Sequence, residues 1–296
     1  MKPGIGRRQF MQRSLAGVAA APAVVHVLGA EAEARPQAVS PNDRVQVGII
    51  GTGSRVQSGV LQAFEAVAGV EVVGVCDAYK GRVERARERR GAKAKDYGDW
   101  RAMLADKSID AVLIATPDHW HKPQTLEALA AGKDVYLEKP MTLTIDEGPE
   151  MYRAAEKSGR ILQVGSQGMS SKLQETARDL VRSGKLGAIH AIRASYDRNS
   201  ESGAWLYPIP PDADEKSVNW DMFLGPAPKR PFSLERFFRW RCYWDYSGGI
   251  STDLFVHLMT TIHSVMGASV PESVVAQGAN YRHQKTHEVP DTLSAS

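Results

Sequence analysis

Five short apolar runs, separated by segments long enough to form helices, constrain the fold of this 296-residue chain more than any other feature. The run at 45–50 has the composition of a buried strand, and similar runs follow at 70–76, 111–115, 135–137 and 161–164. Segments of helix length, such as 81–90 and 123–131, lie between them. Strands that alternate with helices form βαβ units. We therefore predict an α/β fold that begins with a doubly wound parallel sheet of the Rossmann type.

The turn after the first run contains Gly51 and Gly53, and the second run is followed by Asp77, 26 positions after Gly51. A glycine-rich turn between a strand and a helix, with an acidic residue after the next strand, is typical of dinucleotide binding. Gly51 would permit the tight turn, Gly53 would let the backbone approach the pyrophosphate, and the helix N-terminus would bind it. The cofactor-binding residues predicted here are Gly51, Thr52, Gly53, Ser54, Arg55 and Asp77.

Asp77 would accept hydrogen bonds from an adenosine ribose and repel a 2′-phosphate. We therefore predict NAD as the cofactor, although the nearby Lys80 and Arg82 keep NADP open. The third glycine of the usual fingerprint is replaced by Val56. Either the helix sits farther from the strand, or Gly59 provides the close approach. A structural turn that binds no ligand is the alternative.

Four further residues follow the apolar run at 111–115, at the end of the strand where open α/β sheets bind ligands. They are Thr116, Pro117, His119 and His121. The two histidines could bind a metal as a pair, but no carboxylate or further histidine stands at ligand spacing. We therefore predict no metal site and place these residues at the edge of the cofactor.

Two segments farther along the chain contain candidate catalytic residues. Glu138-Lys139-Pro140 follows the apolar run at 135–137, and Gly248-Gly249 precedes Asp253 and His257, which stand four residues apart on a predicted helix. An isolated lysine is usually a solvated surface charge, and an isolated Asp–His pair is equally typical of a structural contact. Together, however, the two segments resemble the glucose–fructose oxidoreductase / inositol dehydrogenase / MocA (Gfo/Idh/MocA) family, over roughly residues 45–281.

The resemblance implies a role for each of these residues. Glu138 and Lys139 would lie beside the nicotinamide, with Lys139 reaching the substrate. His257 would be the general acid or base, because a histidine exchanges protons near neutral pH, and Asp253 would position the substrate or the lysine. The predicted catalytic residues are therefore Lys139, Asp253 and His257. The family commonly has an aspartate three residues after this histidine, where this chain has Thr260, which leaves the orientation of His257 open.

The activity that the resemblance implies is that of an NAD(P)-dependent oxidoreductase. It would transfer a hydride between a bound nicotinamide cofactor and a hydroxyl of a sugar, sugar derivative or cyclitol. Two alternatives use the same fold. One is an NAD-dependent glycosidase that works by transient oxidation and elimination, and the other is a non-catalytic protein that binds a sugar or nucleotide.

The long region at 197–247 is rich in aromatic residues and arginine. Its flat rings and guanidinium groups would suit a sugar, while packing between two domains is the alternative for each ring. The rings and donors named for this role are Trp205, Tyr207, Trp220, Trp240, Tyr243, Trp244, Arg236, Arg239 and Arg241. Nucleic acid is excluded as a partner by charge, because the chain carries a formal net charge of only +3.

The N-terminal segment has the features of an export signal. No acidic residue precedes Glu31, and Arg7 and Arg8 stand in a stretch that resembles the twin-arginine motif. The mildly apolar stretch at 15–30 is shorter and less apolar than a membrane anchor of about 20 residues. We predict a twin-arginine signal peptide at 1–34, no membrane anchor and a periplasmic or secreted location, with a surface helix as the remaining alternative. An NAD-binding domain at 35–168 and a substrate-binding α+β domain at 169–296 would follow.

The substrate-binding domain is expected to hold a mostly antiparallel sheet with strands at 187–196, 273–281 and 291–296. The resemblance implies a larger sheet here, one face of which often forms a subunit interface, so a homo-oligomer stays open. The sequence ends where a strand would begin. We therefore expect a C-terminally truncated domain with an exposed edge strand and an apolar sheet face.

Overall fold

A computed structural model describes residues 43–89, 94–198, 200, 204–268 and 270–296. The predicted signal peptide at 1–34 lies outside the described residues. Within the described part of the chain, no helix combines the length and the apolar character needed to cross a membrane.

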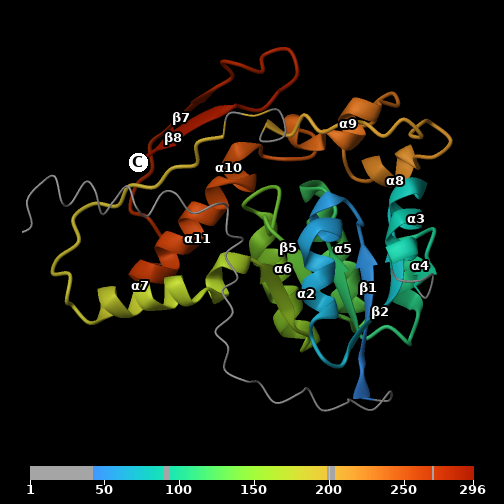
Figure 1. Cartoon of the computed structure of the whole chain (residues 1–296), viewed down its shortest axis with the longest axis horizontal. Helices are drawn as coiled ribbons and strands as arrows, with labels where there is room; N and C mark the ends of the chain where they lie inside the picture. The colour runs from blue at the N-terminus through green and yellow to red at the C-terminus, as the bar shows by residue number, and fades with distance from the viewer. Residues whose placement is uncertain (1–42, 90–93, 199, 201–203, 269) are drawn as a thin grey trace, which may run out of the picture. The chain divides into compact units, whose positions relative to one another are not determined.

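Six parallel strands form the central sheet, as the alternating pattern predicts (Figure 1). They are β1 (Val45–Ile50), β2 (Val70–Cys76), β3 (Lys95–Asp96), β4 (Ala111–Ile114), β5 (Asp134–Glu138) and β6 (Leu162–Gly165). Their order across the sheet is β3-β2-β1-β4-β5-β6, so the strand order reverses between β1 and β4. This confirms a Rossmann-type sheet, and ligands bind such sheets at the carboxyl ends of the strands beside the reversal. The sequence did not indicate β3, because its two residues are charged and exposed.

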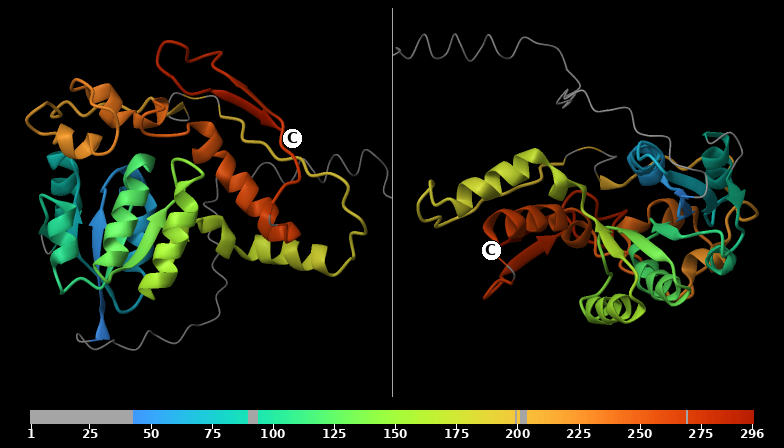
Figure 2. Two further views of the ribbon diagram at one scale, coloured as in Figure 1. Left: turned by 180° about the vertical axis from the view of Figure 1, so that it is seen from behind. Right: turned by 90° about the horizontal axis from the view of Figure 1, so that it is seen from below.

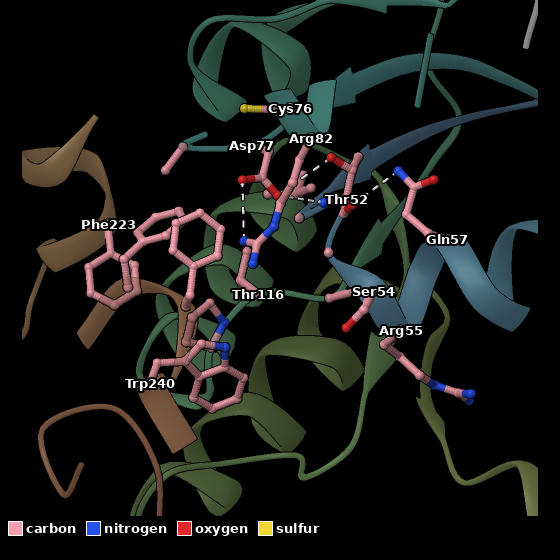
Figure 3. Close-up of a pocket in the computed structure, with 18 of the residues that line it drawn as sticks. Thr52, Ser54, Arg55, Gln57, Cys76, Asp77, Arg82, Thr116, Phe223 and Trp240 are labelled. Atoms are coloured by element: carbon pink, nitrogen blue, oxygen red, sulfur yellow. Dashed lines mark hydrogen bonds and ion pairs between the residues drawn. The ribbon is translucent and has the colours of Figure 1, made fainter. Parts of the chain in front are cut away.

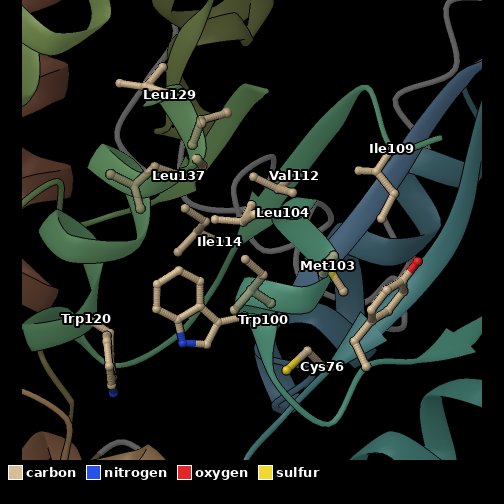
Figure 4. Packing of buried hydrophobic residues seen from close by; sticks show 14 of the residues in the cluster. Cys76, Trp100, Met103, Leu104, Ile109, Val112, Ile114, Trp120, Leu129 and Leu137 are labelled. Carbon is tan, nitrogen blue, oxygen red and sulfur yellow. The ribbon is translucent and has the colours of Figure 1, made fainter. Parts of the chain in front are cut away.

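Each face of the sheet is covered by its own set of helices. One face packs against η2 (Val56–Val60), α2 (Leu61–Glu65) and α3 (Lys80–Arg89). The other packs against α4 (Trp100–Ala105), α5 (His121–Ala130) and α6 (Glu147–Ser158). On this second face the fully buried Trp100 packs among apolar residues of β4 and β5 (Figure 4). Two buried layers hold the strands rigidly and so fix the positions of the loops at their carboxyl ends.

Beyond β6 the chain forms η4 (Gln167–Ser170) and α7 (Lys172–Arg182), which lies beside α11 (Phe255–Met266) (Figure 2). The amide of Gln174 donates to the hydroxyl of Thr261 across this contact, at 2.9 Å. The predicted strand at 187–196 is wrong. This segment has no helix or strand, and it is exposed throughout. Its alternation suits a strand, but none of the described strands pairs with it, and an isolated strand has no partner for its backbone groups.

Residues 205–246, the cover segment, lie over the carboxyl ends of the strands (Figure 1). This segment contains α8 (Trp220–Leu224), α9 (Leu234–Phe238) and η6 (Trp240–Cys242). It is attached to the chain after β2, where the Asn219 N–H donates to Ala78 O at 2.7 Å and the Tyr79 hydroxyl donates to Asp212 Oδ2 at 2.6 Å. It is attached again after β4, where the Trp120 indole N–H donates to Phe223 O at 2.9 Å.

The predicted helix that carries Asp253 and His257 is confirmed with one interruption. It consists of α10 (Ile250–Asp253) and α11, with Leu254 between them. Two antiparallel strands follow, β7 (Ala276–Ala279) and β8 (Thr292–Ala295), both shorter than predicted. Among the described strands, β8 pairs with β7 alone. The second part of the chain therefore contains a small antiparallel sheet. Three of the four residues of β7 are exposed.

Candidate functional site

The glycine-rich turn leaves β1 beside the strand reversal, with Thr116 opposite it and Asp77 at one side (Figure 3). Gly51 has φ +89°, and a Cβ added there would stand 2.6 Å from Ala115 O. Any other residue would therefore be both strained and blocked. At Gly53 an added Cβ would meet only Arg82 Cζ, at 3.9 Å. The turn thus has bare backbone on the cavity side, which fits the close approach of a pyrophosphate.

A buried side chain occupies the position of the missing third glycine. Val56 is 1% exposed and packs into the sheet face, where it begins the π-helical turn η2. Gly59 does not provide the close approach, because a Cβ there would meet only Arg55 Nη1, at 3.5 Å. The helix therefore begins as a π-helical turn with a buried valine where the usual fingerprint has its third glycine.

Asp77 is held by the backbone on both of its oxygens. Oδ2 accepts from the Thr52 N–H at 2.8 Å and Oδ1 from the Tyr79 N–H at 3.0 Å, while an Arg82 nitrogen lies 3.6 Å from Oδ1. These contacts join the ends of β1 and β2 and turn the carboxylate toward the cavity. Because each carboxylate oxygen has a second lone pair, Asp77 keeps acceptors for a ribose.

A cavity of about 430 Å³ extends from this turn under the cover segment. Eight of the predicted cofactor residues line it: Gly51, Thr52, Gly53, Ser54, Arg55, Asp77, Thr116 and Pro117. The cover segment supplies the opposite wall, where the Arg82 guanidinium lies 5.1 Å from the ring centres of both Phe237 and Phe238. A cavity with apolar walls, bare backbone and a carboxylate fits a dinucleotide.

The predicted catalytic residues come together at the end of β5. The Lys139 ammonium donates to Asp253 Oδ1 at 2.8 Å and to the Asp253 carbonyl at 2.9 Å, and both side chains are at most one-tenth exposed. Arg241, in the cover segment, also donates to Asp253 Oδ1, at 2.9 Å. Burial alone would raise the pKa of Asp253, but Arg241 and Lys139 outweigh it and lower that pKa. Asp253 therefore stays ionised and holds Lys139 in place.

His257 is half-buried near this ion pair. Its pKa is lowered by burial and by the positive charge of Lys139, with Asp253 acting in the opposite direction. Among the described residues, no side chain or backbone group forms a hydrogen bond with its ring nitrogens. Thr260, at the position where the family that the sequence resembles commonly has an aspartate, turns its hydroxyl back to Val256 O at 2.5 Å. The imidazole is therefore neutral at pH 7 and available to accept a proton from a ligand.

Two of the predicted cofactor residues are misplaced. His119 and His121 do not line the cavity, because both rings are buried against the backbone. His119 Nε2 lies 2.9 Å from Phe223 O in the cover segment. His121 lies between Pro140 O, 2.6 Å from Nδ1, and Thr116 O, 2.9 Å from Nε2. Burial lowers the pKa of each to about 4. His121 therefore links the loop after β4 to the loop that carries Lys139.

Glu138 also has a different position from the one expected. Its carboxylate is buried and accepts from Arg55 Nε at 3.1 Å. It does not line the cavity, and neither does Lys139, which lies beyond its end with Asp253. Glu138 thus fixes the arginine of the glycine turn and connects the turn to the segment that carries the lysine.

Some of the arginines and aromatic rings at 197–247 line the cavity, and others do not. Tyr207, Trp240 and Arg241 line the cavity, whereas Trp220 and Tyr243 pack in the aromatic cluster of the cover segment. Arg236 and Arg239 form ion pairs with acidic residues outside the cavity. For Trp220 and Tyr243, packing between the two halves of the chain is therefore a better description than sugar binding.

Asp118 is the functional candidate that the sequence did not single out. It lies between the predicted Pro117 and His119, is 1% exposed, and faces the Lys139–Asp253 pair. An acidic residue just after a strand of this kind of sheet was a sufficient reason to consider it. Its burial could not be seen in the sequence, because the residues around it, among them Lys139, Arg241 and Asp253, lie far along the chain.

Comparison with known protein families agrees with this geometry. Residues 45–166 match the Gfo/Idh/MocA model described as an oxidoreductase family with an NAD-binding Rossmann fold. Residues 201–289 match the model for the C-terminal α/β domain of the same oxidoreductase family. The two matched regions together cover more than half of the chain.

Individual relatives are distant. An inositol 2-dehydrogenase from Salmonella typhimurium is 31% identical over 144 residues, 48% of this chain and 43% of the relative. A glycosyl hydrolase family 109 protein from Shewanella baltica is 29% identical over 211 residues, 65% of this chain and 46% of the relative. The chain thus spans less than half the length of these curated relatives.

Among solved structures, the WlbA dehydrogenase from Bordetella pertussis, in complex with NADH and UDP-GlcNAcA, has the same fold. It matches with a TM-score of 0.64 at 22% identity, over 86% of this chain and 63% of the other. Two matching family models and this shared fold lead to one conclusion: the chain belongs to the Gfo/Idh/MocA family of oxidoreductases and has that family's NAD-binding Rossmann fold.

Proposed function

We propose that the protein is an NAD(P)-dependent oxidoreductase that acts on a hydroxyl of a sugar, sugar derivative or cyclitol. The observation that carries this proposal is the buried Lys139–Asp253 ion pair, with a neutral His257 near it, beyond the end of a cavity that fits a dinucleotide. A proton acceptor and a fixed cation beside a nicotinamide site are what the oxidation of an alcohol requires.

Each of the three side chains has one task. His257 takes the proton of the substrate hydroxyl, because its pKa is below the ordinary value and the ring is neutral. Lys139 donates a hydrogen bond to the same oxygen and stabilises the negative charge that develops there. Asp253 accepts from Lys139 and Arg241, so it orients the ammonium and prevents it from moving. In the reverse direction the imidazolium returns the proton.

When bound, the nicotinamide accepts or donates the hydride of the reacting carbon. The residues that would hold the dinucleotide are Gly51, Gly53, Asp77 and Thr116. Asp77 favours NAD, because its carboxylate would repel a 2′-phosphate. Arg82 lies 3.6 Å from that carboxylate, and its charge is already shared with it, so it adds little attraction for such a phosphate.

The test is oxidation of a panel of polyols, cyclitols and sugars by the purified protein with excess NAD, followed by the absorbance of NADH. We expect turnover on at least one class, and loss of it in Lys139→Ala and His257→Ala with NADH affinity retained. A glutamine at an exposed position of α8, Asp221→Gln, is the control. Full turnover in both site variants would contradict the proposed roles. Absence of any bound dinucleotide would instead favour a non-catalytic binding protein.

A second candidate is an NAD-dependent glycosidase, and the 29% identical relative named as a glycosyl hydrolase family 109 protein is the observation that favours it. Such an enzyme would oxidise its substrate, eliminate the leaving group, add water in its place and return the hydride to the sugar, which restores the cofactor in each cycle. Release of a chromogenic aglycone without net accumulation of NADH would support this candidate. Net NADH formation on excess NAD would support the dehydrogenase.

We also propose that the chain is exported folded, with its dinucleotide bound. The twin-arginine pattern at Arg7 and Arg8 supports export, and the attachment of the cover segment on both sides of the cavity supports retention. Fractionation of cells that produce the full chain tests export, and an Arg7→Lys, Arg8→Lys variant should stay in the cytoplasm. Mass spectrometry of the denatured protein tests retention, and protein purified without dinucleotide would contradict it.

A further inference from the structure

Asp118 is a buried carboxyl group without a hydrogen-bond partner. It begins the short helix η3 (Asp118–Trp120), and it is 1% exposed. Neither of its oxygens forms a hydrogen bond of acceptable geometry among the described residues. A buried carboxylate is stable only when it is paired or hydrogen-bonded, and an unpaired one takes up a proton instead.

Charged groups face Asp118 from three other elements. They are Lys139 after β5, Arg241 in η6 and Asp253 in α10. On its own segment, the neighbouring His119 and His121 are both neutral at pH 7. The two cations are within hydrogen-bonding distance of Asp253, at 2.8 and 2.9 Å, and neither is that close to Asp118.

The two acids therefore behave in opposite ways. Burial, and then the charge of Asp253, raise the pKa of Asp118 to about 7, although Arg241, the Ser247 hydroxyl and Lys139 act against this. The Ser247 hydroxyl is close enough to contribute but does not reach hydrogen-bond geometry. Asp253 keeps its charge because the same two cations touch it. When two neighbouring carboxyl groups differ in this way, one serves as the anion and the other holds a proton.

The protonation of Asp118 decides the charge of the whole group. With Asp118 neutral, Lys139 and Arg241 pair with a single anion among the described residues, Asp253, and one positive charge stays uncompensated. With Asp118 ionised, that charge is cancelled. A charge a few ångströms away in a partly dry site changes the stability of a developing oxyanion by an amount that affects the rate.

We propose that Asp118 is a positioning residue for the reaction at Lys139: in its protonated form it leaves one uncompensated positive charge beside the reacting oxygen, and its ionisation removes that charge. The proton is lost to water and regained from it, and no bond to the substrate is formed. This inference rests on the proposed function, which assigns Lys139 to the reacting oxygen, and its first test does not depend on turnover.

The first test is an infrared titration of the whole protein from about pH 5 to pH 9. Protonated carboxyl groups absorb at a frequency separate from that of carboxylates. We expect a band that disappears with a midpoint near pH 7 and that is missing in Asp118→Asn, whose side chain has the same shape and cannot ionise. Asp118→Ser serves if the asparagine variant does not fold, and Asp221→Asn, exposed on α8, is the matched control. If no such band titrates, or if the variants retain it, the inference is wrong.

The second test is the pH dependence of kcat/KM on the polyol or sugar that the wild type oxidises. We expect the wild-type value to fall about tenfold as the pH rises from about 7 to 9, and the Asp118→Asn value to stay nearly constant. A merely structural Asp118 would leave the shape of the profile unchanged in Asp118→Asn, and that result would overturn the positioning role. If the wild type binds NADH but oxidises no compound, the proposed function fails, and the infrared titration still decides whether Asp118 holds a proton.

Discussion

Two parts of the site hold their acidic residues in different ways: the ribose end of the cavity, at Asp77, and the reactive end, where Lys139 and Asp253 lie. At the ribose end, Asp77 is fixed by N–H groups of Thr52 and Tyr79, which lie on the adjoining turns. At the reactive end, Asp253 is fixed by side chains from two distant segments, Lys139 and Arg241. Backbone contacts of this kind follow from the turn itself. Side-chain contacts of the second kind exist only when the whole chain has folded.

The difference has a functional consequence. Backbone donors are permanently available, so the position of Asp77 depends mainly on the two adjoining turns. The reactive end consists of buried charges that depend on one another, and loss of one member leaves the others uncompensated. We therefore expect changes at the ribose end to weaken binding, and changes at the reactive end to affect turnover and its pH dependence.

The largest effect is expected at the reactive end. Lys139→Ala removes the donor to the reacting oxygen, and turnover should fall by about 10³-fold, as when an oxyanion donor is removed. NADH affinity should stay within about twofold of the wild type, because Lys139 does not line the cavity. Steady-state kinetics and fluorescence titration measure the two quantities. If Lys139→Ala lost NADH affinity and turnover together, binding and reaction would not be separated between the two ends.

A smaller effect is expected on stability. The pKa of Asp118 is raised to about 7 in the folded protein, against an ordinary value near 4 in the unfolded chain. Its favourable contribution is therefore complete below about pH 4 and is lost as the pH rises through 7. Between about pH 5 and pH 8 the wild type should lose roughly 2 to 3 kcal/mol of unfolding free energy relative to Asp118→Asn. Urea unfolding at both pH values measures this difference. If the free energy of unfolding changed equally with pH in the wild type and in Asp118→Asn, the result would contradict the buried proton.

At the ribose end the expected effect is smaller again. Asp77→Ala removes acceptors for the ribose and leaves two N–H groups without their partner, so NADH affinity should fall by about tenfold. The rate at saturating NADH should change little. Thermal unfolding of the variant provides the control for folding. If turnover at saturation falls as far as in Lys139→Ala, Asp77 does more than bind.

The smallest effect concerns the proton acceptor. Arg198 is one of the cations that lower the pKa of His257, after burial, Lys139 and Arg55. Its removal in Arg198→Ala should raise that pKa and move the acidic limb of the kcat/KM profile to higher pH. Because the unshifted histidine titrates near 6.5, the wild-type limb should lie below that value. A downward shift in the variant would exclude His257 as the group responsible for the limb.

The sequence predicted the sheet well because its strands are buried runs of apolar residues, and Val45–Ile50 and Val70–Cys76 appear as predicted. It also predicted Asp77 and the turn, since both depend on neighbouring residues. It could not place His119 and His121, because they are buried by residues of the cover segment and of the loop after β5 that lie far along the chain. The strand expected at 187–196 had the right pattern, but a pattern does not supply a pairing partner. Asp118 was overlooked for a similar reason, because its surroundings are built from four separate segments.

A double-mutant cycle can separate binding at Asp77 from reaction at Lys139. NADH affinity and the rate of a single turnover would be measured for the wild type, Asp77→Ala, Lys139→Ala and the double variant. We expect the double variant to have the affinity of Asp77→Ala and the turnover of Lys139→Ala, with less than about 0.5 kcal/mol of coupling in the binding free energy. Coupling well above that value, or an affinity loss caused by Lys139→Ala alone, would contradict this separation.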